Sequence, residues 1–366
     1  MRNKSRIAIV FGARPTFIKM SPLIKALKLK RANFFIIHTG QHYSKELNKV
    51  FFEELKIPKP DYNLKVGSGS QAYQTGLALI KIEKIFLKEK PDLVLVYGDT
   101  NAMLSGALGA AKLHLPLAHI EAGLRSYDRF MPEEINRVMA DHLSDYLFAP
   151  TEIAKTNLLK EGVKKEKIFV VGNLIVDALF QNIKVTSKYL KLLKNLKIKK
   201  NNYFLITAHR PENVDVKEKL SGILEGLSLI YKTYNLPIIF PIHPRSEKMI
   251  KKFKLKIPEG IKLTKPVGYF EFLTLMKNAK LVLTDSGGVQ EEGCILKIPC
   301  VTLRENTERP ETIKVKSNVL VGTDPEKILK GVKTMIQHKK NWKNPFGDGK
   351  TSLKIIKILR KEGFLI

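Results

Sequence analysis

The residues best suited to do chemistry lie in the stretch TDSGGVQEEG, residues 284–293. An apolar, strand-like run ends there, and a helix is expected to begin at the Ser-Gly-Gly turn. Ser286 can cap that helix, Gly287 and Gly288 let the backbone approach a bulky ligand, and the free N–H groups of a helix start attract phosphate. Glu292, about one and a half turns further, offers a carboxylate that could accept hydrogen bonds from two vicinal hydroxyls, as on a ribose. The pattern indicates a nucleotide site, although a well-capped helix alone would also explain it.

Carboxylates stand at or just beyond the ends of apolar runs in the first half of the chain. Asp99 follows DLVLVYG, Glu121 follows LPLAHI, and Glu133 belongs to PEEINR. Paired carboxylates can divide acid and base duties when their environments separate their pKa values. Structural roles are also open: Asp99 could cap the Ala-rich helix expected over 101–112, and Glu133 could sit in a first helical turn at i,i+4 ion-pair spacing from Arg137.

Histidines and cations follow other apolar runs. His209 comes after LITA, and near a diphosphate it would tend to hold a proton and donate a hydrogen bond to a leaving group. His243 occupies a parallel position and could equally be a loop histidine. Arg14 and Lys19, at a strand-to-helix turn, offer a guanidinium fork and a point charge for a diphosphate, although each alone is commonplace.

The elements that must position these groups are apolar, Val- and Ile-rich runs alternating with helical patterns along the whole chain. This βαβ alternation predicts two Rossmann-like, doubly wound parallel-sheet domains. We expect a first domain with the carboxylates over residues 1–175, a second, nucleotide-binding domain over 176–348, and a helix in 349–366 that packs back on the first. The expected strands are IAIVF, FFIIHTG, DLVLVYGD, LPLAHIEAG, DYLFAPT, KIFVVGN, YFLITAHR, PIIFPIHP, IKLTKPVGY, LVLTDSGG and IPCVTLRE.

Ligands of open α/β sheets bind outside the carboxyl ends of the strands. The polar residues named above collect at such ends, and two rims facing each other across a cleft would form one site. GARPTFIK lacks the G-x-G-x-x-G pattern of a dinucleotide fold. No His-rich or carboxylate-His spacing indicates a tightly held metal. We therefore expect neither a nicotinamide nor another cofactor, and no metal.

The net charge of +29 would suit a polyanionic partner. Its distribution indicates that most of the lysines coat the surface and that a smaller share serves a polyanionic substrate. Residues 181–202 hold seven lysines and no acid, while Leu190, Leu193, Leu196 and Ile198 recur nearly at helical spacing. This is typical of a solvated amphipathic helix. Arginines are not interleaved with aromatic residues, and no zinc-finger or RNP-type pattern occurs. A basic nucleic-acid-binding module would explain the charge but not the polar strand ends, so we expect no nucleic-acid partner.

The 366 residues, 44% of them hydrophobic, suffice for two domains with proper cores. The apolar run near the start is five residues long, which is short for a secretory signal, and no window of about 18 apolar residues predicts a membrane span. Cys294 and Cys300 lack metal or redox spacing, so buried reduced thiols are expected. A cytoplasmic protein fits these observations.

Taken together, the motifs closely resemble those of the non-hydrolysing UDP-N-acetylglucosamine 2-epimerases, in order and spacing along nearly the whole chain. They are GARPTFIK (12–19), TGQH (39–42), YGDTNA (97–102), HIEAGLRS (119–126), PEEINR (132–137), LFAPT (147–151), VGN (171–173), TAHRPEN (207–213), HP (243–244), DSGGVQEEG (285–293) and LRENTERPE (303–311). The resemblance implies a glycosyltransferase-B type fold, a homodimer, and interconversion of UDP-GlcNAc and UDP-ManNAc for surface glycans. It also implies a mechanism without redox cofactor: anti elimination of UDP to 2-acetamidoglucal, then syn re-addition.

The resemblance also assigns residues. Asp99, Glu121 and Glu133 match the catalytic carboxylates, and His209 is expected to act with them. The implied substrate-binding set is Arg14, Lys19, Gln41, His42, Arg137, Arg210, His243, Tyr269, Phe270, Ser286, Gly287, Gly288, Glu292 and Arg309. Of these, Gln41, His42 and Arg210 lie in motifs matching those where some members bind activating UDP-GlcNAc. Thr16 departs from the family, which commonly has Glu there, and puts a local hydrogen bond in doubt.

Two rivals share parts of this pattern. A glycosyltransferase of the same fold would replace the glucal step with an acceptor, but it needs little beyond one base, whereas epimerisation must handle protons on both faces of C2. A hydrolysing epimerase, which releases ManNAc and UDP, usually carries a kinase domain for which 366 residues leave no room.

Overall fold

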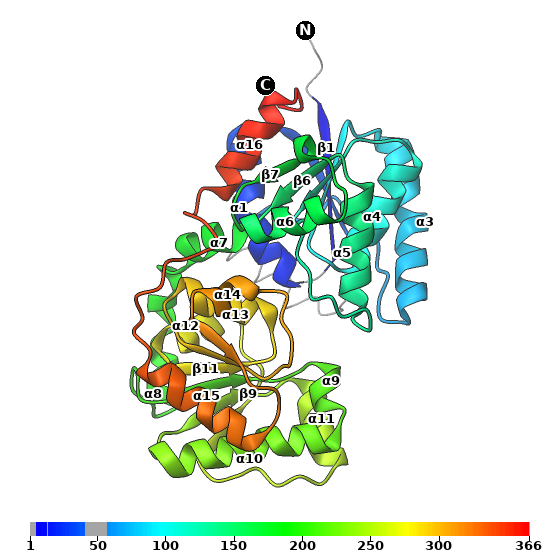
Figure 1. Ribbon diagram of the computed structural model, residues 1–366. Helices are drawn as coiled ribbons and strands as arrows, with labels where there is room; N and C mark the ends of the chain where they lie inside the picture. The colour runs from blue at the N-terminus through cyan, green and yellow to red at the C-terminus, as the bar shows by residue number, and fades with distance from the viewer. Residues whose placement is uncertain (1–4, 13, 41–56, 366) are drawn as a thin grey trace. The chain divides into compact units, whose positions relative to one another are not determined.

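The computed structural model describes residues 5–12, 14–40 and 57–365, and the chain divides into two compact units (Figure 1). Unit 1 comprises Met1–Ala178 and Phe346–Ile366, and unit 2 comprises Leu179–Pro345. None of the described helices is long and apolar enough to cross a membrane.

Unit 1 is built on a seven-stranded parallel sheet in the order β3-β2-β1-β4-β5-β6-β7. Its strands are β1 (Arg6–Phe11), β2 (Asn33–His38), β3 (Tyr62–Asn63), β4 (Leu93–Tyr97), β5 (Leu117–Ile120), β6 (Tyr146–Ala149) and β7 (Ile168–Val170). Every residue of β4 and β5 is buried, because helices cover both faces of the sheet. The apolar runs therefore predicted six of these strands, while the two-residue edge strand β3 carries too short a pattern to be recognised.

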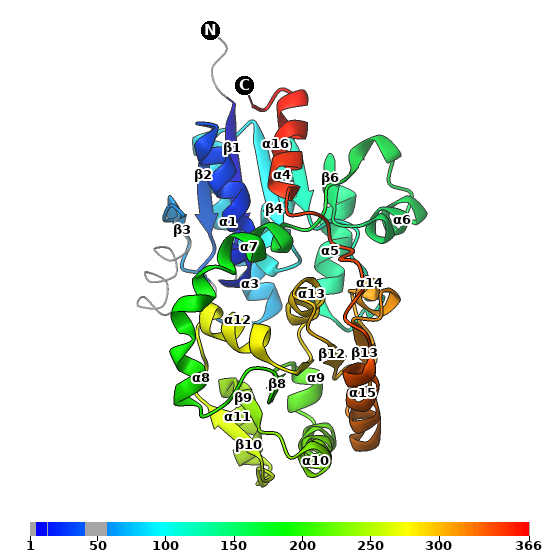
Figure 2. The same ribbon diagram turned by 90° about the vertical axis from the view of Figure 1, so that its left-hand side faces the viewer.

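The helices of unit 1 form two layers, one on each face of this sheet (Figure 2). They are α1 (Arg14–Leu29), α3 (Gln71–Glu89), α4 (Asn101–Lys112), α5 (Pro132–Leu143), α6 (Glu152–Lys160), the 3₁₀ turn η1 (Lys165–Lys167), α7 (Leu174–Asn182, which runs into unit 2) and α16 (Thr351–Lys361). Helices α3, α4 and α5 enclose one core with Val10 and Val96, and α1 and α16 lie on the opposite face.

The last helix is tied into unit 1 although it comes from the far end of the chain. Helix α16 packs on α1. The buried Asp177 carboxylate of α7 accepts hydrogen bonds from the backbone N–H groups of Thr351 (3.1 Å) and Ser352 (2.9 Å). Because the first amides of a helix lack internal acceptors, this carboxylate caps α16.

Unit 2 repeats the design with a six-stranded parallel sheet in the order β10-β9-β8-β11-β12-β13. Its strands are β8 (Phe204–Thr207), β9 (Ile238–Pro241), β10 (Ile261–Thr264), β11 (Leu281–Thr284), β12 (Cys300–Thr302) and β13 (Asn318–Leu320). Its helices are η2 (Val185–Tyr189), α8 (Lys191–Asn195), α9 (Pro211–Val214), α10 (Lys217–Tyr234), α11 (Pro244–Lys252), α12 (Tyr269–Asn278), α13 (Gly287–Ile295), α14 (Pro310–Lys314) and α15 (Pro325–Gln337). Both sheets confirm the predicted doubly wound parallel fold.

The lysine-rich stretch 181–202 differs from its prediction. Instead of one amphipathic helix, it holds the end of α7, then η2, then the five-residue α8. Leu193 and Ile198 are buried, but Leu190 is 48% exposed. Seven lysines without an acid repel one another along a helix, and the residue before α8 supplies no capping hydrogen bond, so the segment breaks into short turns.

Both cysteines match the expected buried, reduced thiols. Cys294 and Cys300 are free and buried. Burial raises the pKa of Cys294 to about 11 and that of Cys300 to about 12, so neither forms a reactive thiolate near neutral pH.

Candidate active site

In each unit the strand order reverses at one point, and the candidate residues gather there. In unit 1 the reversal lies between β1 and β4, whose following segments carry Lys19 and Asp99, with Glu121 after the adjacent β5. In unit 2 it lies between β8 and β11, which lead into His209 and Asp285. The carboxyl ends of strands at such a switch point are where open α/β sheets bind ligands.

Glu121 is held tightly at the end of β5. Its side chain is 6% exposed, and its Oε1 accepts hydrogen bonds from Lys19 Nζ (2.9 Å) and Asn173 Nδ2 (3.0 Å). Its backbone adopts a φ of +73°, a conformation that non-glycine residues rarely take and that commonly marks functional sites. The ammonium of Lys19, which the sequence suggested for a diphosphate, thus stabilises an ionised Glu121. Asn173, in the VGN motif, was missing from the predicted site.

Asp99 does not cap the helix that follows it. The N-cap of α4 is Thr100, whose side chain accepts from the Met103 N–H. The Asp99 carboxylate is instead 31% exposed and accepts a hydrogen bond from Arg137 Nη2 at 2.6 Å. The structure therefore leaves Asp99 with a side chain that is oriented by a buried cation and still reaches solvent.

The two glutamates of PEEINR differ in burial and in partners. Glu134 is buried, pairs with Arg137 at 2.5 Å and accepts from the backbone N–H groups of Ser126 and Tyr127, both at 2.9 Å. Its neighbour Glu133 is half-buried in the same first turn of α5. Glu134 thus shapes the loop before α5, a role that the sequence pattern did not separate from that of Glu133.

His209 in unit 2 is organised by Asp285, which the sequence had not assigned to the site. The fully buried Asp285 carboxylate accepts from the backbone N–H groups of His209 (2.8 Å) and Arg210 (2.9 Å). Its Oδ1 lies 3.2 Å from His209 Nδ1. Burial opposes ionisation of Asp285, but the hydrogen bonds and charge of His209 and the two amides hold its pKa below the usual value. The His209 ring is thereby oriented while 40% of its side chain remains exposed.

The Ser-Gly-Gly turn begins α13 as predicted, but the Ser286 side chain does not cap the helix. Ser286 has N-cap conformation, but among the described residues its side chain makes no capping hydrogen bond. A Cβ on Gly287 would overlap the Glu308 carboxylate, so a larger residue there would displace the Glu308 side chain. Glu308 itself pairs with Arg304 at 2.8 Å and with Arg210 at 3.5 Å. Gly288 faces more open space, with Ser286 Oγ as the nearest contact of a Cβ at 4.0 Å.

Glu292, Tyr269, Phe270 and Arg309 all lie in unit 2 close to α12 and α13. Burial, and next the charge and hydrogen bonding of Glu292, raise the pKa of the Tyr269 phenol well above its usual value, so these two side chains are neighbours. Phe270 is buried and stacks on Tyr189 with ring centroids 6.1 Å apart. Arg309 is buried and its Nε donates to Glu291 Oε1 at 2.5 Å.

The remaining predicted residues lie partly outside the described chain. Gln41 and His42 lie outside the described residues, as does the side chain of Arg14, whose backbone begins α1. His243 is exposed, caps α11 by accepting from the Arg245 N–H at 3.1 Å, and has its ring centroid 5.6 Å from that of His209. Thr16 is buried in the first turn of α1.

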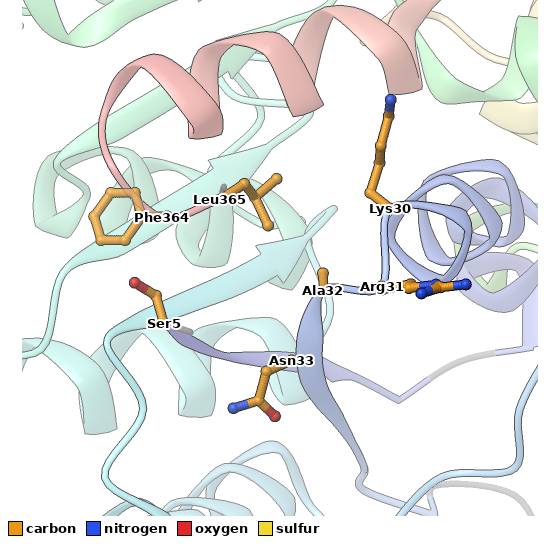
Figure 3. A pocket seen from close by; sticks show the side chains of 7 residues that line it. All are labelled: Ser5, Lys30, Arg31, Ala32, Asn33, Phe364 and Leu365. Carbon is orange, nitrogen blue, oxygen red and sulfur yellow. The ribbon is translucent and has the colours of Figure 1, made fainter. Parts of the chain in front are cut away.

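A small cavity lies at the opposite, amino-terminal edge of the unit 1 sheet (Figure 3). Its volume is about 30 Å³, and Ser5, Lys30, Asn33, Phe364 and Leu365 help to line it. Such a space suits ordered water rather than a sugar nucleotide. Within the described residues no group of three or more His, Cys, Asp or Glu side chains could hold a metal ion.

Comparison with known proteins agrees with this geometry. The family model described as UDP-N-acetylglucosamine 2-epimerase matches residues 25–360. The UDP-N-acetylglucosamine 2-epimerase of Methanocaldococcus jannaschii is 57% identical over 360 residues, which are 97% of this chain and 98% of the relative. A UDP-2,3-diacetamido-2,3-dideoxy-D-glucuronate 2-epimerase of Pseudomonas aeruginosa is 42% identical over 361 residues, covering 97% and 99%.

Solved structures agree as well. The crystal structure of the M. jannaschii UDP-GlcNAc 2-epimerase in complex with UDP-GlcNAc and UDP matches with a TM-score of 0.91, covering 97% of this chain and 99% of that one. A glycosyltransferase from Rickettsia africae, 17% identical, covers 98% of both chains with a TM-score of 0.58 and shares the fold alone. The glycosyltransferase-B type fold is thereby confirmed, and the chain belongs to the UDP-N-acetylglucosamine 2-epimerase family of isomerases.

Proposed function

We propose that this protein interconverts UDP-GlcNAc and UDP-ManNAc by anti elimination of UDP and syn re-addition. In the first step the C1–O bond to UDP breaks with its electron pair leaving on UDP, a base takes the C2 proton, and a C1=C2 double bond forms. Re-addition delivers a proton to the opposite face of C2 while UDP re-forms the C1–O bond. The C2 hydrogen is not acidic until the leaving group departs, so leaving-group stabilisation must accompany proton removal.

The observation that carries this proposal is a pair of carboxylates at neighbouring strand ends. Asp99 follows β4 and Glu121 follows β5, and each is oriented by a cation, Arg137 at 2.6 Å and Lys19 at 2.9 Å. Two carboxylates in different environments suit an enzyme that removes and returns protons on two faces of one carbon. Glu133, half-buried at the start of α5, is proposed as a third participant.

We assign the UDP to unit 2. The N-terminal amides of α13, with Ser286 and Gly288, suit the diphosphate, and Glu292 beside Tyr269 suits the ribose hydroxyls. His209, oriented by Asp285, donates a hydrogen bond to the departing phosphate. The remaining proposed contacts are Arg14, Gln41, His42, Arg210, His243, Gly287, Phe270 and Arg309.

Incubation in D₂O tests the reaction. UDP-GlcNAc treated without NAD should yield UDP-ManNAc deuterated at C2, because the returning proton comes from a group that exchanges with solvent. NMR of both sugars measures this. Product that keeps its original C2 hydrogen would exclude elimination, and free UDP appearing only with an acceptor sugar would favour a glycosyltransferase.

Parallel incubation with UDP-2,3-diacetamido-2,3-dideoxy-D-glucuronate, the sugar named for the P. aeruginosa relative, compares the two substrates.

Glu292→Ala is expected to weaken UDP binding without a specific loss of proton chemistry. Each lost hydrogen bond to a charged group is worth roughly 1.5–3 kcal/mol, or about tenfold or more in Kd. Calorimetric titration with UDP measures the change, and Glu326→Ala, in the first turn of α15, is the matched control. Unchanged UDP affinity would return Glu292 to a purely structural role.

We also propose a homodimer that buries the outer face of α3. Tyr73, Ile80 and Leu87 recur every seven residues along this helix and are 54%, 55% and 57% exposed. Such a stripe of large apolar side chains marks an association surface. Ile80→Asp should convert the dimer to a monomer in light scattering, whereas Leu29→Asp, on α1 and 83% exposed, should not. A monomeric wild-type protein would refute the dimer.

A further inference from the structure

A fully buried histidine lies between the two turns that carry Asp99 and Glu121. His119 belongs to β5, two residues before Glu121, and its side chain is 0% exposed. Its Nε2 lies 2.8 Å from the Gly98 carbonyl oxygen, and its Nδ1 lies 2.7 Å from Asp141 Oδ1. The ring therefore links the segment after β4 to helix α5.

Both neighbours of this ring accept hydrogen bonds. The carbonyl of Gly98 has no proton to give, so Nε2 donates to it. Burial opposes ionisation of Asp141, but His119 and Arg125 hold the pKa of its carboxyl below the usual value. The His119 ring thus bridges the Gly98 carbonyl and the buried Asp141 carboxyl.

The same pair anchors the second turn. Asp141 Oδ2 accepts from the backbone N–H of Gly123 at 3.0 Å, two residues after Glu121. It also pairs with Arg125 Nη1 at 2.7 Å. Three residues in these turns have left-handed backbones, with φ of +77° at Gly98, +73° at Glu121 and +82° at Gly123. Glycine adopts such a φ readily, whereas at Glu121 this conformation persists only where the surroundings over-determine it.

We propose that His119 and Asp141 are positioning residues that fix the Asp99 and Glu121 carboxylates relative to each other for proton transfer at C2. The inference rests on the proposed function, since it assumes that these two carboxylates act on one substrate carbon. His119 holds the backbone next to Asp99, and Asp141 holds the backbone after Glu121. Neither needs to touch the substrate. Proton transfer depends on geometry to within about 1 Å, and such a misplacement costs about 10²-fold in rate.

His119→Asn, His119→Gln and Asp141→Asn test this proposal. We expect kcat to fall on the order of 10–100-fold, with KM and calorimetric UDP affinity within threefold, because unit 2 holds the UDP. His119→Gln, which keeps a longer amide donor toward Gly98, should recover part of the kcat lost in His119→Asn. Glu89→Gln is the matched control: it alters another buried carboxylate of unit 1, which pairs with Arg6 of β1, and should leave kcat unchanged.

A double-variant cycle separates positioning from general stability. In a Glu121→Gln background the His119→Asn substitution should cost much less in single-turnover rate than it does alone, because the group it positions is already disabled. An equal loss in both backgrounds would overturn the proposal, as would kcat within threefold of wild type or a loss that follows only the folded fraction in thermal unfolding. An inactive wild-type protein would overturn the proposed function itself, whereas an active wild type with fully active His119 variants would overturn this inference alone.

Discussion

Glu121→Gln is expected to lower kcat by ~10²–10⁴, the range typical of a general acid or base. In the wild type, Asn173 Nδ2 donates to the Glu121 carboxylate at 3.0 Å. Glutamine keeps the shape of the side chain and an oxygen that can still accept this hydrogen bond. It cannot take or return a proton, and it leaves Lys19 without its counter-charge. The affinity for UDP should change by no more than a few-fold, because that part of the substrate is assigned to unit 2.

Steady-state kinetics and calorimetry with UDP measure the two effects separately. Glu152→Gln is the control, since that carboxylate is 75% exposed and belongs to α6 of the same unit. Near-normal turnover in the Glu121 variant would remove its catalytic role. Asp99→Asn and Glu133→Gln pose the same question for the other two carboxylates.

Asp285→Asn is expected to reduce both stability and turnover. The Asp285 carboxylate is buried and accepts from the amides of His209 and Arg210 while facing the His209 ring. Asparagine offers these two amides a neutral acceptor, and a hydrogen bond to a charged group contributes about 1.5–3 kcal/mol. The variant should therefore unfold at lower denaturant concentration, and its turnover should fall because His209 loses its orientation.

Asp324→Asn is the matched control for this loss. Asp324 also accepts a backbone amide, that of Lys327 at 2.8 Å, but it does so on the exposed start of α15. Its replacement should cost about 1 kcal/mol or less. If both variants lose equal stability, the buried Asp285 carboxylate contributes no more than an ordinary exposed helix cap.

The pH dependence of the Asp285 effect has a defined sign. Its pKa is lowered in the folded protein, so its contribution is fully present above the unfolded-state pKa of about 3.9 and is lost as the pH falls through the folded value. The difference in free energy of unfolding between wild type and Asp285→Asn should be constant from about pH 5 to neutrality and should shrink in stronger acid. Urea titrations across this range measure it, and a difference that stays unchanged in strong acid would contradict the assignment.

The fold followed from sequence because its signals are local. A buried parallel strand appears in the sequence as an apolar run, and the helix after it appears as apolar residues at helical spacing. Eleven of the described strands were therefore predicted from short stretches of sequence. Among the described strands, only the short ones Tyr62–Asn63 and Asn318–Leu320 were missed. Placing Asp99, Glu121 and His209 at strand ends was equally local, since parallel strands bring their carboxyl ends to one edge of a sheet.

The partners of these residues were decided by tertiary structure. Asp285 and His209 are 76 residues apart in the chain, and Asn173 and Glu121 are 52 apart, so no window contains both members of either pair. For Asp99, only the structure showed that Thr100 caps α4 and that Arg137 forms an ion pair with the Asp99 carboxylate.

By itself, then, the sequence determined the doubly wound fold, the family motifs and the strand ends at which the polar groups stand. Tertiary structure decided which carboxylate is buried with which cation and which backbone turn each pair holds. The physical reason is range: secondary structure follows from periods of two to four residues, whereas the energy of a buried charge depends on partners that only folding brings within hydrogen-bond distance.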